Sequence, residues 1–141
     1  MNLLVSFYLL LASAAGPPSP VDVEIADGDW SQLPSLQARG YDHLSSKFMA
    51  RLLEIASEGQ CHLPGYNGNQ LDLTLSFAAQ FDPGGTLQRI VLPKLNCPEA
   101  EGLIGGALLA MMQGGDYRPT GKNPEGWYRG HFAFSYDDAS R

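Results

Sequence analysis

The side chains in this sequence best suited to catalysis or metal binding are those of three histidines and two cysteines. His43, His62 and His131 are scattered along the chain, and no spacing places a nucleophile and an orienting carboxylate beside any of them. There is no Gly-x-Ser-x-Gly elbow and no Gly-Lys-Ser/Thr phosphate loop. These observations favour a protein that is not an enzyme. The alternative is a small secreted enzyme or inhibitor whose site is built from loops, such as residues 62–69.

Cys61 and Cys97 are the cysteines of the chain. In an exported protein, two cysteines predict one disulfide, since disulfides persist in oxidising compartments. Two free buried thiols are the alternative. Structural zinc sites use close pairs of cysteine or histidine ligands, and the sequence has no such pairs. We therefore expect no metal and no cofactor.

The first 15 residues have the pattern of a secretion signal. An apolar run from Leu3 to Leu11 is followed by small residues, Ala12-Ser13-Ala14-Ala15, and then by the helix breaker Gly16-Pro17-Pro18. The run is shorter than the about 20 apolar residues that span a bilayer. The sequence thus predicts a cleaved signal and a periplasmic or secreted protein. An uncleaved anchor or a buried N-terminal helix is the alternative, because no lysine or arginine precedes the run.

Size and charge narrow the class of partner. A chain of 141 residues corresponds to one domain. Acidic side chains outnumber basic ones by 15 to 9, which gives a formal net charge of −6. This balance argues against nucleic acid and anionic membrane surfaces as partners. The sequence does not indicate an oligomeric state.

Two helices are predicted from apolar residues that recur every three or four positions. The first covers residues 41–57, with Asp42 as its N-cap. Its apolar face consists of Leu44, Phe48, Leu52 and Ile55. The second begins at Asn96, the expected N-cap, with Glu99 as capping partner. Its broad apolar face combines the row Leu103, Ala107 and Ala110 with the row Ile104, Leu108 and Met111.

Strands are predicted where apolar and polar residues alternate. The longest such segment, residues 71–81, leads through the turn Asp82-Pro83-Gly84-Gly85 into a return strand at residues 86–92, which predicts a β-hairpin. Residues 127–136 alternate aromatic residues with other types and predict the last strand. Residues 21–25 alternate over a shorter stretch.

The order of these elements predicts an α+β domain over residues 41–136. We expect a small antiparallel sheet of about three strands packed by two helices, in the order helix-strand-strand-helix-strand. Residues 16–40 would be an N-terminal extension and residues 137–141 a polar tail.

This order resembles the C-terminal domain of the TonB/TolA superfamily of periplasmic envelope proteins. The residues that carry the resemblance are the long strand, the Asp-x-x-Gly turn (Asp82–Gly85), the triplet Tyr117-Arg118-Pro119 after the second helix, and the aromatic last strand. It implies an envelope binding module that takes a protein or peptide partner by strand addition. The cysteines are also similar to the TolA-type pair, although Cys61 lies earlier than that pattern has it.

The last strand supplies the predicted binding residues. Trp127, Arg129 and His131 share the face opposite the aromatic residues that we expect in the core. Tryptophan and arginine are enriched at binding hot spots, and a strand at the edge of a sheet can accept a partner strand. The alternative is an ordinary amphipathic outer face.

Overall fold

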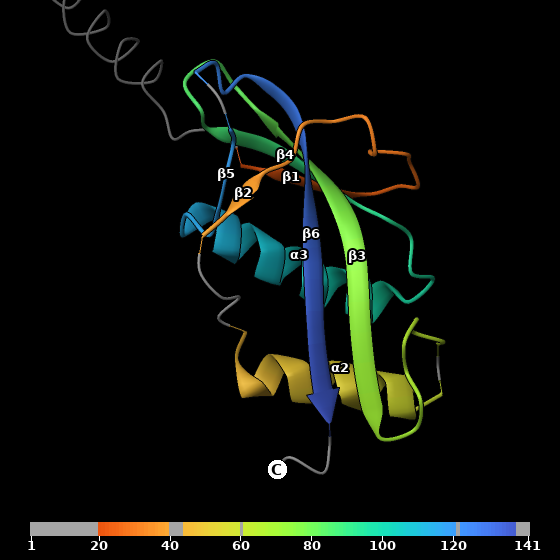
Figure 1. The fold of residues 1–141 in the computed structure, drawn as a ribbon. Coiled ribbons are helices and arrows are strands. Elements are labelled where there is room, and N and C mark those ends of the chain that lie inside the picture. Colours follow the sequence, from red (N-terminus) through yellow and green to blue (C-terminus); the bar gives the residue numbers. More distant parts are fainter. Residues whose placement is uncertain (1–19, 40–43, 60, 121, 138–141) are drawn as a thin grey trace, which may run out of the picture.

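A mixed four-stranded sheet is the centre of the computed structural model, which describes residues 20–39, 44–59, 61–120 and 122–137 (Figure 1). The strand order is β1 (Asp22–Ile25), β4 (Leu87–Leu92), β3 (Gln70–Phe81) and β6 (Gly126–Asp137). A second sheet pairs β2 (Gln37–Ala38) with β5 (Tyr117–Arg118). The α+β class is confirmed. The predicted signal segment and His43 lie outside the described residues.

The long strands β3 and β6 pair antiparallel from Gln70↔Asp137 to Phe81↔Gly126. On β3, the predicted apolar face is buried, with Leu71, Phe77 and Ala79 fully so. On β6, Tyr128 and Phe132 are buried on the same face of the sheet. Burial on one side of a pleated strand has a period of two, so the alternation in the sequence identified both strands and both faces correctly.

The predicted hairpin between β3 and β4 is also confirmed. Gly85 has a φ of +82°, and its N–H donates to the carbonyl of Asp82. The Asp82 carboxylate accepts from the N–H of Thr86 at 2.8 Å. Aspartate commonly accepts such bonds in turns, and glycine adopts a positive φ without a steric penalty.

The expectation of about three strands, all antiparallel, was wrong, because β1 adds a fourth. β1 pairs in parallel with β4, from Asp22↔Arg89 to Ile25↔Leu92. A parallel pair requires a long connection, which here contains the whole α2–β3 region. Short-range patterns in the sequence do not report on such a distant pairing, so the sequence predicted the strand but not its place in the sheet.

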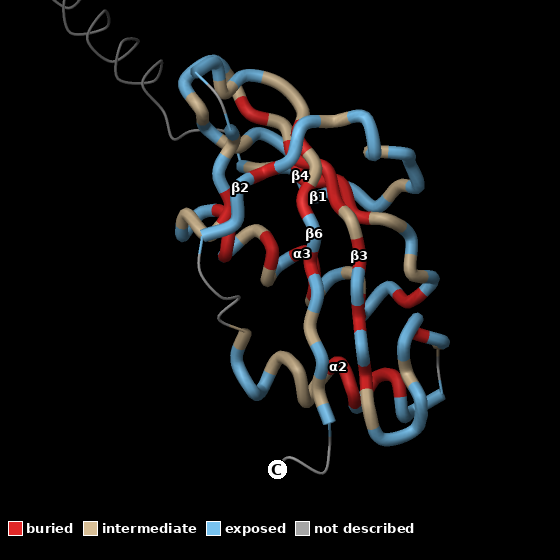
Figure 2. Tube along the Cα trace, in the orientation of Figure 1, coloured by how far each residue is buried: buried red, intermediate tan, exposed pale blue. Residues whose placement is uncertain are grey.

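Two helices cover the apolar face of the sheet: α2 (Ser46–Ser57) and α3 (Pro98–Gln113) (Figure 1). Figure 2 shows buried residues where the strands and helices face each other and exposed residues along most connecting loops. α2 begins later than expected. Its N-cap is Ser45, whose hydroxyl accepts from the N–H of Phe48 at 3.1 Å; the predicted cap, Asp42, lies outside the described residues.

α3 begins differently from the prediction. Its N-cap is Cys97 rather than Asn96, which has a φ of +56° and precedes the helix. The carboxylate of Glu101, not that of Glu99, reaches back and accepts from the N–H of Leu95 at 2.7 Å. The buried row of α3 is Ile104, Leu108 and Met111 with Ala100, Gly105 and Met112, whereas Leu103 and Ala107 are half-buried and Ala110 is exposed.

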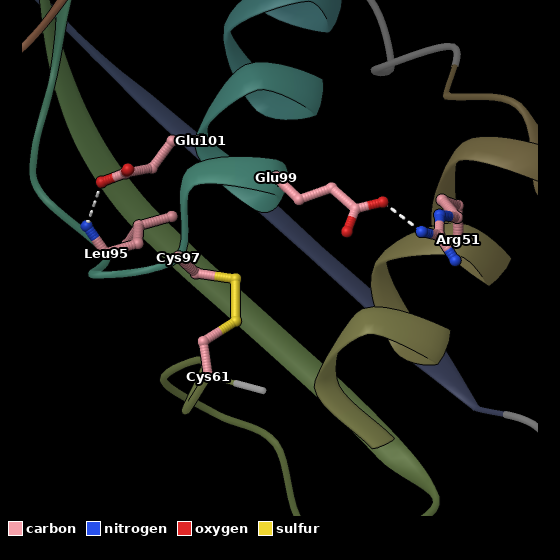
Figure 3. The surroundings of a disulfide bond; sticks show 6 residues. All are labelled: Arg51, Cys61, Leu95, Cys97, Glu99 and Glu101. Atoms are coloured by element: carbon pink, nitrogen blue, oxygen red, sulfur yellow. Dashed lines mark hydrogen bonds and ion pairs between the residues drawn. A yellow bond between two sulfur atoms is a disulfide. The ribbon is translucent and has the colours of Figure 1, made fainter. Parts of the chain in front are cut away.

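A disulfide joins Cys61 to Cys97, with the Cα atoms 5.4 Å apart, as predicted. It ties the loop after α2 to the first turn of α3 (Figure 3). Arg51 of α2 forms an ion pair with Glu99 of α3 nearby. In the described part of the chain, no helix has the length and hydrophobicity needed to cross a membrane.

Candidate binding site at the edges of the sheet

Trp127, Arg129 and His131 lie on the face of the sheet opposite the helices, as predicted. Trp127 and Arg129 are half-buried and His131 is exposed. Arg129 is held by the connection between β1 and β2, because its Nε donates to the carbonyl of Leu33 at 3.0 Å. The three side chains share a strand face, but part of that face is already covered.

β6 is an edge strand, yet its edge is occupied at Arg129. The N–H of Arg129 donates to the carbonyl of Pro34 at 2.9 Å, and its carbonyl accepts from the N–H of Leu36 at 2.7 Å. The carbonyl of His131 accepts from the hydroxyl of Tyr117 at 2.9 Å. A partner strand would have to displace these bonds. The chain has therefore filled this half of the edge with its own residues.

The segment that covers Arg129 also encloses a hollow of about 320 Å³ between Trp30, Ser76 and Arg129. At its margin, the hydroxyl of Ser76 lies 3.1 Å from Nδ1 of His131, its cross-strand partner. A catalytic histidine needs a group that orients it. The described hydrogen-bond partner of the His131 ring is the hydroxyl of Ser76. Two hydrogen bonds from Ser31 lower the pKa of nearby Asp29. The bond from the side chain of Ser31 has the larger effect and the bond from its backbone the smaller.

The loop considered for the alternative enzyme site, residues 62–69, directly follows Cys61 of the disulfide. His62 is exposed, and the loop is fixed by main-chain bonds from Gly65 and Asn67 to the start of β3. The N–H of Asp72 donates to the carbonyl of Gly65 at 3.0 Å. This loop is thus ordered by the backbone of β3.

The rest of the β6 edge is open. Arg129 directs its N–H and C=O away from β3, and residues two positions apart in a strand do the same. Ala133 and Ser135 therefore present their main-chain groups outward, and both residues are exposed. No other described strand pairs with them. This short stretch is the first of two free edges.

The second free edge is β1, at the other side of the sheet. The N–H of Ala26 donates to the carbonyl of Leu92 on β4 at 2.8 Å. In a parallel ladder the direction alternates, so Glu24 also faces β4, whereas Val23 and Ile25 direct their N–H and C=O away from the sheet. Since β1 ends the strand order, no described strand pairs with these groups.

Beside this edge lies an apolar groove. Val23 and Ile25 are 38% and 37% exposed and are the exposed large hydrophobic residues of the described chain. Together with Gly102, Gly105 and Gly106 of α3, they line a hollow of about 480 Å³. Gly105 lets β1 approach α3 closely, since a Cβ atom on it would lie 3.0 Å from Cγ1 of Val23. An unpaired strand edge with exposed apolar side chains is a template for another strand.

The sequence contained a signal for this groove that hydrophobic periodicity does not capture. Glycines inside a helix weaken it by roughly 1 kcal/mol each relative to alanine, and three lie within five positions of α3. Because these glycines destabilise the helix, we expect the space left by their absent side chains to serve a purpose. Periodicity instead drew attention to Trp127, Arg129 and His131, because aromatic and charged residues are conspicuous in a strand.

No cluster of three or more histidine, cysteine, aspartate or glutamate side chains that could hold a metal ion occurs among residues 20–39, 44–59, 61–120 and 122–137. The resemblance to the TonB/TolA C-terminal domain stays a prediction. Comparison with protein-family models, with curated proteins and with solved structures finds no match to this chain.

Proposed function

We propose that this protein is an exported, non-enzymatic binding module that takes an extended segment of a protein or peptide partner by strand addition to β1. The observation that carries the proposal is the coincidence of outward main-chain groups and exposed apolar side chains at Val23 and Ile25. In strand addition, main-chain hydrogen bonds provide affinity and pockets for alternate side chains provide specificity. The β1 edge offers both.

The β1 edge is a better site than the edge of β6. At Arg129 the β6 edge is closed by Pro34 and Leu36. Its open stretch presents the small or polar side chains of Ala133 and Ser135 on the outer face. At β1, a partner strand gains four main-chain hydrogen bonds from Val23 and Ile25 and covers their apolar surface. Burial of apolar surface contributes about 25 cal/mol per Å².

The proposal is tested with a synthetic neutral peptide in which valine and threonine alternate. The variant Ile25→Pro removes one outward donor and places a ring at the free edge, while the bonds from β1 to β4 are kept. Proline is tolerated in edge strands where its nitrogen faces outward. We expect Ile25→Pro to weaken peptide binding at least tenfold in a calorimetric titration, and thermal unfolding to show a folded protein.

Ala133→Pro is the matched control, because it makes the same change at the open edge of β6. It is expected to leave peptide affinity unchanged. If Ala133→Pro abolishes binding and Ile25→Pro does not, the partner adds to β6 and the assignment to β1 is wrong. If the unmodified protein binds none of the alternating peptides, charged ones included, strand addition itself is wrong.

A further inference from the structure

We infer that the β1 edge selects a strand in which apolar and basic residues alternate, with the apolar side chains over the glycines of α3 and the basic ones beside Asp22 and Glu24. This inference rests on the proposed function and names the chemistry of the partner. It is carried by the distribution of side chains about β1, whose two faces differ in character.

The face of β1 toward α3 is apolar. It consists of Val23 and Ile25 above Gly102, Gly105 and Gly106, where small helical residues leave room for an added side chain. No Cβ atom placed on Gly102 or Gly106 would meet another atom within 4 Å. Apolar side chains of a strand added outside β1 can therefore descend beside β1, over Gly102 and Gly106. A charged side chain in the same place would lose hydration against the apolar surface of Val23 and Ile25.

The opposite face of β1 is acidic. Asp22 and Glu24 are exposed and alternate with the two apolar residues. The one described ion pair at these carboxylates joins Glu24 to Arg89, at 3.7 Å. Of the two carboxylates, Glu24 is thus the one with a described ion pair. Glu101 is not part of this face: it lines the groove on the side of α3, where its carboxylate accepts from the N–H of Leu95.

The register of a sheet fixes which residues of two neighbouring strands lie opposite each other. The distribution of side chains on β1 therefore predicts a preferred sequence for the partner strand. Residues directly opposite each other on neighbouring strands point to the same face. The partner residues opposite Val23 and Ile25 therefore enter the groove, and those opposite Asp22 and Glu24 lie beside the carboxylates. Opposite charges in such pairs are favourable and like charges are unfavourable. The preferred partner strand has apolar residues opposite Val23 and Ile25, and lysine or arginine opposite Asp22 and Glu24.

The same reasoning disfavours a second copy of this chain as the occupant. Antiparallel pairing of two β1 strands would set Glu24 against Glu24 or Asp22 on a molecule with a net charge of −6. Like charges at this position oppose edge-to-edge association and protect an exposed edge from pairing with itself. We expect the protein to sediment at a mass that does not change with concentration.

The test compares three peptides of equal length in which valine alternates with lysine, threonine or glutamate. The basic peptide is expected to bind the unmodified protein about tenfold more tightly than the neutral one, the effect of two favourable cross-strand charge pairs. The acidic peptide should bind least. The advantage of the basic peptide should shrink at 1 M salt, where the screening length is about 3 Å.

Two charge variants separate this inference from the proposed function. In Asp22→Asn/Glu24→Gln, the basic and neutral peptides should bind equally well. The control Glu54→Gln/Glu58→Gln removes the same charge from exposed positions of α2 and should keep the preference. One outcome would contradict charge selection but not strand addition: the neutral and basic peptides bind the unmodified protein with equal affinity, and Ile25→Pro weakens the binding of the neutral peptide. If the basic peptide binds but ignores Ile25→Pro, both are wrong.

Discussion

The three glycines of α3 beside β1 lack side chains at positions that line the proposed site. Gly102 and Gly106 are exposed, adopt helical φ angles and have open space where a Cβ atom would lie. Gly105 is buried and faces Val23 and Leu92. The three positions therefore differ in what an added methyl group would meet, which makes their roles separable.

Replacing both exposed glycines, as Gly102→Ala/Gly106→Ala, is expected to stabilise the protein and weaken peptide binding together. Each change removes a helical glycine and should raise the free energy of unfolding by roughly 0.5–1 kcal/mol. The added methyl groups fill the floor of the groove, so affinity for the alternating peptides should fall severalfold. Chemical denaturation and calorimetric titration measure the two effects.

Gly105→Ala is the comparison for that double variant. Its methyl group would meet Cγ1 of Val23 at 3.0 Å, so it should gain less stability than either exposed change. Unchanged affinity of the double variant for the peptides would show that the peptide does not use the space above these glycines.

At the scale of elements, the sequence predicted most of what lies in long amphipathic segments. β3, β6 and the core of α2 were identified because each buries one face at a regular period, and β4 was identified as the return strand after the Asp82–Gly85 turn. β2 and β5 have two residues each, too few to show a period. The hydrophobic pattern of α3 offered two neighbouring rows, and only contact with the sheet decides between them.

The site could be predicted only in part for the same reason. The alternation at Val23 and Ile25 was visible, but its exposure depends on β1 being the last strand in the order, which is a property of the assembled sheet. The closure of β6 at Arg129 likewise depends on residues 34–36, almost a hundred positions away in sequence. Local patterns contain no information about such distant partners.

The disulfide should contribute strongly to the stability of the elements that it joins. We expect Cys61→Ala/Cys97→Ala to lower the free energy of unfolding by about 2–4 kcal/mol, because the cross-link restricts the unfolded chain. The bridge spans a sequence separation of 36 residues. Equilibrium denaturation in urea measures the loss.

Arg51→Ala is the control for this region. It removes the ion pairs with Glu54, Glu58 and Glu99, all near the surface, and such pairs are worth about 0–1 kcal/mol each. A double-cysteine variant no less stable than Arg51→Ala would contradict the assignment of a major stabilising role to the disulfide.

For the whole molecule, the strongest expectation from sequence is export. The disulfide is compatible with an oxidising compartment. We expect the exported protein to begin at Ala15 or Gly16, after removal of the apolar segment. N-terminal sequencing of the protein recovered from outside the cytoplasm checks this expectation, and a mature protein that still begins at Met1 would contradict it.

The strand order has a mechanical consequence. β1 is parallel to β4, and β4 and β6 are both antiparallel to β3, so the first and last strands of the sheet run in the same direction. Asp22, at the start of β1, and Asp137, at the end of β6, therefore lie at opposite ends of the sheet. Tension applied between these residues pulls the outer strands along their length, in shear, so the hydrogen bonds of a ladder resist together. Pulling sideways on β6 would instead open its ladder one bond at a time, at a lower force.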